Sequence, residues 1–86
     1  MAEVTIYTSA FCGFCHRAKR LLESKGVAFI EIDVTADAET RRLMAERAGG
    51  QRSVPQIFIG ETHVGGCNDL YELDSAGQLD KLLNPA

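Results

Sequence analysis

Residues 4–34, VTIYTSAFCGFCHRAKRLLESKGVAFIEIDV, decide the fold. The run at 4–8 is rich in β-branched and aromatic residues, which is typical of a strand. From about 12–25 the apolar side chains fall at helical spacing, and Gly26 follows where a left-handed C-terminal cap is favoured. Alternation over 29–34 predicts a second strand. Because strand–helix–strand crossovers within one sheet are right-handed units, these two strands are expected to be parallel.

A second helix is predicted to start at Asp37, which can act as its N-cap, and to run to about Ala48. Leu43 and Met44 are expected to face the core. The elements that follow are, in chain order, a strand at 56–59, a turn at Gly60-Glu61, a strand at 62–64, a helix at 68–73 and a last helix that carries Leu79, Leu82 and Leu83. The order β-α-β-α-β-β-α-α predicts an α/β fold in which helices flank both faces of a four-stranded mixed sheet.

Length, composition and charge exclude several classes of protein. The 86 residues, 45% hydrophobic and 24% charged, predict one globular domain over 1–86. The net charge of −3 argues against a nucleic-acid binder that depends on bulk positive charge. No apolar run approaches the roughly 20 residues that span a bilayer, so no membrane partner is expected. The N-terminus lacks the features of a signal peptide, which favours a cytoplasmic location.

Cysteine usage indicates chemistry or metal binding rather than a framework of structural disulfides. The count of three leaves one cysteine unpaired, and the cytoplasm keeps thiols reduced. Cys12-Gly13-Phe14-Cys15 lies where the first strand passes into the first helix. The positive end of that helix and its free amides stabilise a thiolate at Cys12, and Cys15 follows one turn later, within reach of a disulfide. We therefore expect an exposed attacking thiol at Cys12 and a sheltered resolving thiol at Cys15.

The residues alone also allow two other interpretations of the cysteines, a zinc site and buried side chains. Cys12, Cys15, His63 and Cys67 form a C-x2-C…H-x3-C set, a spacing that occurs in zinc sites. The long separation between the two halves of this set weighs against zinc, as does the position of the first pair at a strand–helix junction. The cysteines can also be read as buried side chains that are not linked.

A basic cluster follows the cysteine pair. It consists of Arg17, Lys19 and Arg20, and no acidic residue lies between Val4 and Leu22. The cluster either gives the thiols a positive surrounding or is a solvated helix face.

Three motifs in order resemble those of the glutaredoxins, which are small thiol–disulfide oxidoreductases of the thioredoxin fold. Residues 12–16, CGFCH, are similar to the active-site motif of that family. Residues 53–59, SVPQIFI, are similar to its Thr-Val-Pro segment, in which the proline is cis, and residues 65–70, GGCNDL, to its third signature. A lone C-x-x-C is a weak signal, whereas three ordered motifs in a chain that matches from 4 to 83 are a specific one.

The resemblance implies a thioredoxin-like fold and the glutathione-dependent reduction of protein–glutathione mixed disulfides and of protein disulfides. It implies Cys12 as the nucleophile and Cys15 as the resolving thiol, with glutathione as the co-substrate. The implied glutathione-binding residues are Phe14, Ser53, Val54, Pro55, Gly66, Cys67, Asn68 and Asp69. The implied partners are glutathione and glutathionylated or disulfide-bonded proteins, which a monomer would serve.

The chemistry of these residues suits glutathione. With a cis Pro55, the backbone of Val54 would face the thiols, where an extended peptide can pair with it. The amides of a helix that starts after Gly66 can bind a carboxylate, and Asp69 can accept a hydrogen bond from an ammonium group. Taken singly, the proline segment is equally well a tight turn, and the glycine pair is equally well the end of a strand.

Four positions depart from the family pattern: Ser9, Gly13, Phe14, which lacks the hydroxyl of the common tyrosine, and Asn68, which lacks the charge of the aspartate in many members. Ser9 stands where members often carry a lysine, so Arg52 becomes the candidate cation for the glycyl carboxylate of glutathione, unless it is simply exposed. Gly13 stands where proline is common, and some glutaredoxins with that glycine resemble carriers of a 2Fe–2S cluster. The alternative function is therefore a homodimeric carrier whose cluster is held by Cys12 and glutathione, with no metal expected in the apo form.

Overall fold

The computed structural model describes residues 2–85, which form four strands and four helices in the predicted order. The elements are β1 (Val4–Thr8), α1 (Gly13–Ser24), β2 (Ile30–Asp33), α2 (Ala38–Arg47), β3 (Gln56–Ile59), β4 (Thr62–Gly65), α3 (Cys67–Ser75) and α4 (Leu79–Leu83). No helix within this range has both the length and the apolar character that crossing a membrane requires.

The strands form one mixed sheet in the order β2-β1-β3-β4. β1 pairs in parallel with β2, as the strand–helix–strand unit predicts, and antiparallel with β3, which in turn pairs antiparallel with β4. The register between β3 and β4 shifts at Ile57 and Phe58, so that His63 lies opposite Phe58 while Gly65 lies opposite Ile57. A bulge of this kind re-aims side chains, and here it occurs just before the chain turns into α3.

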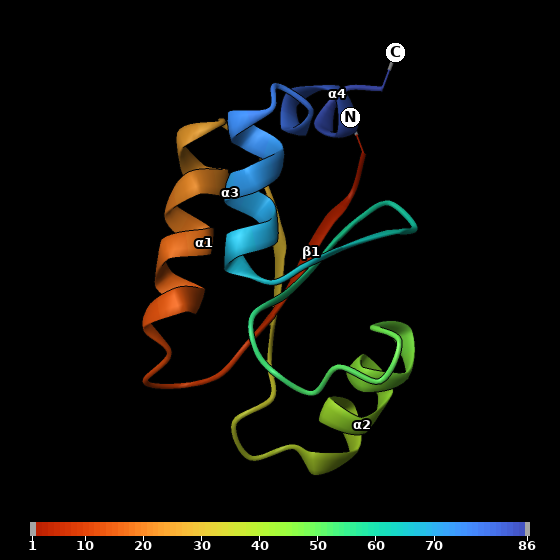
Figure 1. The fold of residues 1–86 in the computed structure, drawn as a ribbon. Helices are drawn as coiled ribbons and strands as arrows, with labels where there is room; N and C mark the ends of the chain where they lie inside the picture. The colour runs from red at the N-terminus through yellow and green to blue at the C-terminus, as the bar shows by residue number, and fades with distance from the viewer. Residues whose placement is uncertain (1, 86) are drawn as a thin grey trace.

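Helices cover both faces of the sheet (Figure 1), which confirms the predicted fold class. α1 and α3 lie side by side on one face, and α2 lies on the other. Alternation along a strand explains the division, because Ile6 joins the core under α1 and α3 whereas the next residue, Tyr7, joins the core under α2. The α2-side core consists of Tyr7, Val34, Met44, Ala48 and Phe58.

The prediction that Leu43 faces the core is wrong. Its side chain is 46% exposed, whereas that of the neighbouring Met44 is fully buried. Successive residues of a helix point about 100° apart. Because α2 buries only a narrow stripe of Met44, Ala45 and Ala48, it has room inside for one of the two large side chains.

The ends of the first two helices follow the sequence signals. Asp37 is the N-cap of α2, since its Oδ1 accepts the backbone N–H of Thr40 at 2.9 Å. Gly26 follows α1 with a φ of +70°, the left-handed conformation expected there. α1 starts one residue later than predicted, because Cys12 is its N-cap rather than its first helical residue. This position of Cys12 is the one that matters for the site.

Candidate active site

Cys12 lies at the N-terminal tip of α1. Its Sγ accepts a hydrogen bond from the backbone N–H of Cys15 at 3.1 Å and lies 3.8 Å from the carbonyl oxygen of Val54. The first turn of α1 has no acidic side chain, so the amides at the helix tip act on the sulfur unopposed within that turn. The sequence predicted an exposed Cys12, but the residue is half-buried, because Val54 approaches it from the facing loop.

Cys15 is sheltered, as predicted. The residue is 2% exposed, and both thiols of the pair are free rather than joined in a disulfide. Burial, followed by hydrogen bonding to Cys12, raises the pKa of the Cys15 thiol from 9.0 to about 12. Burial therefore favours the neutral form of the Cys15 thiol, and Cys12, at the helix tip, is the candidate for the first nucleophile.

The loop before β3 brings a backbone edge to the sulfur of Cys12. The peptide bond between Val54 and Pro55 is cis, as the family resemblance implied. The carbonyl of Val54 points toward Cys12, and Ser53 precedes it at the start of the same edge. Val54 is the residue whose backbone was expected to pair with an extended peptide.

The N-terminus of α3 forms the opposite wall. Gly65 has a φ of +115°, and a Cβ at this position would overlap the carboxylate of Asp69. Gly66 is the N-cap of the helix, and its backbone N–H donates to Oδ2 of Asp69 at 2.9 Å. α3 begins at Cys67, so the amides of Cys67 and Asn68 lie in its first turn, where a helix has no internal acceptors for them.

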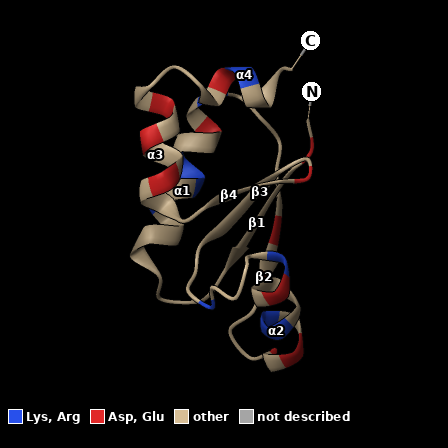
Figure 2. Ribbon diagram, turned by 45° about the vertical axis from the view of Figure 1, so that its right-hand side comes forward, with Lys and Arg blue, Asp and Glu red and all other residues tan. Residues whose placement is uncertain are grey.

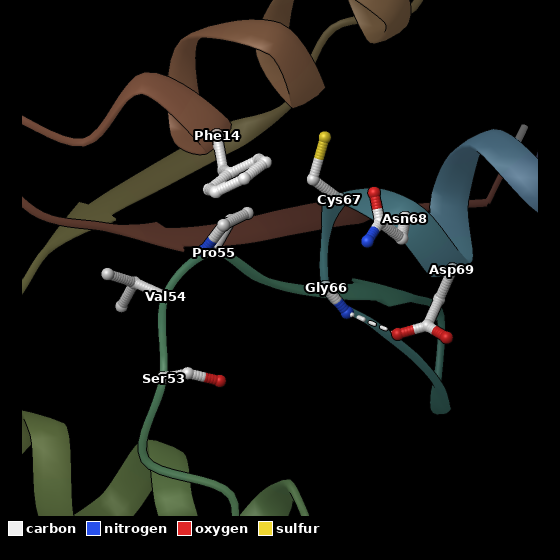
Figure 3. A pocket seen from close by; sticks show the side chains of 8 residues that line it. All are labelled: Phe14, Ser53, Val54, Pro55, Gly66, Cys67, Asn68 and Asp69. Atoms are coloured by element: carbon white, nitrogen blue, oxygen red, sulfur yellow. Dashed lines mark hydrogen bonds between the residues drawn. The ribbon is translucent and has the colours of Figure 1, made fainter.

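These walls enclose a cavity of about 200 Å³ between α1, the cis-proline loop and α3 (Figure 3). The cavity is lined by Phe14, Ser53, Val54, Pro55, Gly66, Cys67, Asn68 and Asp69. They are the eight residues named from the sequence, so the structure brings the whole predicted set around one cavity. What binds in the cavity remains a prediction. Cys12 stands beside it, facing Val54.

Cys67 contributes to this cavity with a thiol that is largely covered. The residue is 4% exposed, and burial raises the pKa of its thiol above the ordinary value. In Figure 3 its sulfur points away from Gly66 toward α1. A buried neutral thiol is a poor nucleophile, so the backbone of Cys67 is the part that the cavity offers to a ligand.

The basic cluster is partly neutralised. Lys19 forms an ion pair with Glu31 at 3.0 Å, and the guanidinium of Arg17 lies 5.4 Å from the centre of the Tyr71 ring. Figure 2 shows acidic residues spaced along α3, next to this part of α1. The cluster is therefore a mixed surface rather than an isolated positive one.

Two arginines lie at the loop before Ser53: Arg52 belongs to the loop, and Arg41 belongs to α2. Arg52 is exposed, and its carbonyl oxygen accepts a hydrogen bond from Nε of Arg41 at 3.1 Å. Arg52 was expected here from the sequence and Arg41 was not, because no local spacing links a residue of α2 to this loop. Tertiary packing brings them together.

The zinc interpretation finds no support. Within residues 2–85, no three His, Cys, Asp or Glu side chains are grouped so that they could hold a metal ion. Of the four proposed ligands, His63 is engaged elsewhere: its Nε2 lies 2.7 Å from Oε1 of Gln56, and its ring stacks on Phe58.

Comparison with known proteins decides the family. Residues 4–64 match the family model named Glutaredoxin. The chain belongs to the glutaredoxin family. It is 58% identical over 86 residues to a glutaredoxin of Neisseria meningitidis serogroup A, covering 99% of this chain and 100% of that one. It is 54% identical over 83 residues to Glutaredoxin 3 of Escherichia coli strain K12, covering 96% and 99%.

Solved structures agree with this glutaredoxin assignment. A crystal structure of a buckwheat glutaredoxin–glutathione complex superimposes with a TM-score of 0.88 at 28% identity, covering 98% of this chain and 78% of that one. The thioredoxin-like fold is thus established. As a glutaredoxin, the chain is a thiol–disulfide oxidoreductase, and glutaredoxins interact with glutathione.

Proposed function

We propose that this glutaredoxin uses glutathione to reduce protein–glutathione mixed disulfides and protein disulfides. The observation that carries the proposal is the placement of a free Cys12 thiol at the tip of α1, facing Val54 beside the cavity of about 200 Å³. A helix tip that favours a thiolate is combined with a backbone edge and a second helix N-terminus. Such a site suits a short peptide that carries both a sulfur and a terminal carboxylate.

Glutathione fits the polar groups around the cavity. Its extended backbone would pair with Val54, which places the central sulfur toward Cys12. Its α-carboxylate would accept from the amides of Cys67 and Asn68. Oδ2 of Asp69 is taken by the Gly66 amide, which leaves Oδ1 for the ammonium group. These contacts assign each charged end of the γ-glutamyl unit to a group of opposite sign.

The glycyl end of glutathione needs a cation because Ser9 occupies the place of the lysine that is frequent in the family. Arg52 and Arg41 both lie at the loop that leads into Ser53. We assign the glycyl carboxylate to this positive end of the loop, where a guanidinium can pair with it in a bidentate manner.

Mixed disulfides would be reduced in two exchanges at Cys12. The thiolate attacks the glutathione sulfur, so that a bond from Cys12 to that sulfur forms and the bond to the protein sulfur breaks. The protein leaves as a thiolate, which takes a proton from water. A second glutathione thiolate then attacks the glutathione sulfur bound to Cys12, which yields glutathione disulfide and restores the Cys12 thiolate.

Protein disulfides would require Cys15. Attack by Cys12 on such a disulfide forms a mixed disulfide and releases one substrate sulfur as a thiolate. The Cys15 thiolate then forms a bond to Cys12 and releases the second substrate sulfur. Two glutathione molecules reduce the Cys12–Cys15 bond and leave as glutathione disulfide. Burial disfavours the Cys15 thiolate, so this route requires Cys15 to lose its proton before it attacks.

The alternative function, a carrier of a 2Fe–2S cluster, requires the chain to provide a thiol ligand. Cys15 is buried, and residues 2–85 hold no group of three or more metal ligands, so Cys12 is the thiol that this site can offer. A Cβ at Gly13 would meet no atom within 4 Å, so the space beside Cys12 is open. The remaining ligands would come from glutathione and a second copy. A bound cluster would supply electron-transfer or cluster-transfer chemistry, with Cys12 anchoring it.

A coupled assay tests the proposal. Glutathione, glutathione reductase and the mixed disulfide of glutathione with 2-mercaptoethanol are combined with the protein, and NADPH oxidation is followed. Cys12→Ser should reduce the rate to background, while Cys15→Ser should keep mixed-disulfide reduction and lose the reduction of a protein disulfide. Comparable activity in Cys12→Ser and the parent would refute the assigned nucleophile. A visible absorption band in an anaerobic preparation would support the cluster alternative.

A further inference from the structure

Gln56 is a buried polar side chain that the mechanism above does not use. It is the first residue of β3, directly after the cis proline, and it is fully buried. Its Nε2 donates to the carbonyl oxygen of Ser53 at 3.0 Å and reaches Oγ of Ser53 and Oε1 of Gln51, each at 3.3 Å. Its Oε1 lies 2.7 Å from Nε2 of His63. A buried amide is costly unless it is paired, and both ends of this one are.

The contacts fix which way the amide points and which nitrogen of His63 carries a proton. The carbonyl oxygen of Ser53 can only accept, so the amide group of Gln56 must present Nε2 to it. Oε1 then faces His63 and can only accept, so Nε2 of His63 is the protonated nitrogen. The carbonyl of Ser53 therefore fixes the direction of both hydrogen bonds that link His63 to the loop through Gln56.

His63 is held in place from another side. Its ring stacks on Phe58, with centroids 5.0 Å apart and planes at 28°. The guanidinium of Arg47 lies 4.2 Å from the centre of the same Phe58 ring. His63 lies directly opposite Phe58 in the register of β3 and β4, which brings its ring onto Phe58. The imidazole is thus a fixed donor rather than a free surface group.

The Ser53–Val54 peptide links this network to the cavity. The cis peptide bond is the one between Val54 and Pro55, so the Ser53–Val54 bond is trans. In a planar trans peptide the C=O and the N–H point in opposite directions. When Gln56 holds the Ser53 carbonyl toward the protein interior, it turns the N–H of Val54 the other way. Ser53 and Val54 both line the cavity, so this orientation sets the edge that the cavity presents.

We propose that Gln56 and His63 are positioning residues for the glutathione site, acting through the Ser53–Val54 peptide. The proposal rests on the function proposed above, because it assumes that a glutathionyl substrate pairs with Val54. Neither residue lines the cavity, so their effect is confined to the orientation of that edge. Losing the network should weaken substrate binding and leave the reactivity of Cys12 unchanged.

His63→Phe is the main test, because a phenyl ring can still stack on Phe58 while the donor to Gln56 is lost. KM for the mixed disulfide of glutathione with 2-mercaptoethanol should rise about fivefold, the equivalent of one hydrogen bond. The turnover number and the rate of Cys12 alkylation by iodoacetamide should stay within twofold of the parent. His63→Gln should recover most of the lost affinity, since its amide can donate to Gln56.

Gln56→Glu is a second, independent variant that tests the same proposal. A carboxylate can still accept from His63 but cannot donate to the Ser53 carbonyl, so KM should rise at least as much as in His63→Phe. Thr62→Val is the matched control on β4: it is an exposed residue outside the network and should leave KM unchanged. Circular dichroism checks that each variant is folded.

Two failures are distinguishable. A parent protein that does not reduce the glutathione mixed disulfide refutes the proposed function, and with it the positioning role. An active parent, with folded His63→Phe and Gln56→Glu variants whose KM stays within twofold, refutes the positioning role alone. A loss of melting temperature without a change in KM would give Gln56 and His63 a purely structural role and would likewise overturn the proposal.

Discussion

The two faces of the sheet bury polar atoms in different ways. On the side of α1 and α3 the thiols of Cys15 and Cys67 are buried, and burial raises the pKa of each, while the buried hydroxyl of Thr8 donates to Oε2 of Glu31 at 2.7 Å. On the side of α2 they are the amide of Gln56 and the hydroxyl of Tyr7, and each has hydrogen-bond partners. A thiol is a weak donor that can be buried as a neutral group, whereas an amide or a phenol must be paired. Thiols can therefore be buried on the reactive side without strong hydrogen bonds, whereas the hydroxyl of Thr8 and the amide and phenol on the α2 side are paired.

The largest expected effect concerns Cys15. Burial disfavours its thiolate, and so does the neighbouring Cys12, so the pKa rises to about 12. Replacing Cys12 by Ser removes the negative sulfur and should lower the pKa of Cys15 part of the way, while burial keeps it above 9.0. The pH dependence of alkylation in Cys12→Ser measures this midpoint.

A Cys15 midpoint at or below 9.0 in that variant would show that burial is not the main cause, and the contrast between the two faces would lose its basis. Denatured protein is the control for the unperturbed thiol.

Core truncations compare the two faces directly. Leu22 and Met44 are both fully buried, but the first belongs to the larger core under α1 and α3 and the second to the smaller one under α2. Leu22→Ala should lower the free energy of unfolding by about 3–4 kcal/mol and Met44→Ala by about 2 kcal/mol, because a smaller core covered by a single helix can close around the cavity more easily. Urea titration gives both values. The reverse order would mean that α2 is the more tightly packed helix.

Alanine substitutions at Gly65 and Gly26 distinguish the cost of backbone strain from the cost of steric overlap. Gly65→Ala should cost about 2–3 kcal/mol, because φ is positive and the new methyl group would displace the Asp69 carboxylate. Gly26→Ala is the matched control: its φ is also positive, yet a Cβ there meets no atom within 4 Å, so about 1 kcal/mol is expected. Thermal unfolding distinguishes them. Equal losses would show that the contact between Gly65 and Asp69 is unimportant.

The smallest effect is expected on the α2 side. Tyr7→Phe removes the hydroxyl that accepts from Nη1 of Arg47 at 2.9 Å and keeps the edge-to-face contact with Phe58. The guanidinium of Arg47 can turn to water, so the free energy of unfolding should fall by only about 0.5–1 kcal/mol. A loss above roughly 2 kcal/mol in urea titration would indicate that the hydroxyl supports the whole Arg47–Phe58 stack.

Much of the fold was predictable because its signals are local. The cap at Asp37, the left-handed Gly26 and the alternation along the strands act within a few residues, and each is seen in the structure. The error at Leu43 arose because periodicity defines a stripe but not its width, which depends on how closely α2 packs. The eight residues that three motifs singled out line one cavity, and their role in binding glutathione stays a prediction.

The sequence by itself determined the order of the elements and the placement of Cys12 at a helix start, because helical spacing, capping and strand alternation are properties of neighbouring residues. Only the tertiary structure decided that Arg41 lies beside Arg52, that Cys15 is buried enough to stay neutral, and that His63 reaches Ser53 through Gln56. These relations depend on how distant segments pack and on how much water they exclude, and no local pattern records either quantity.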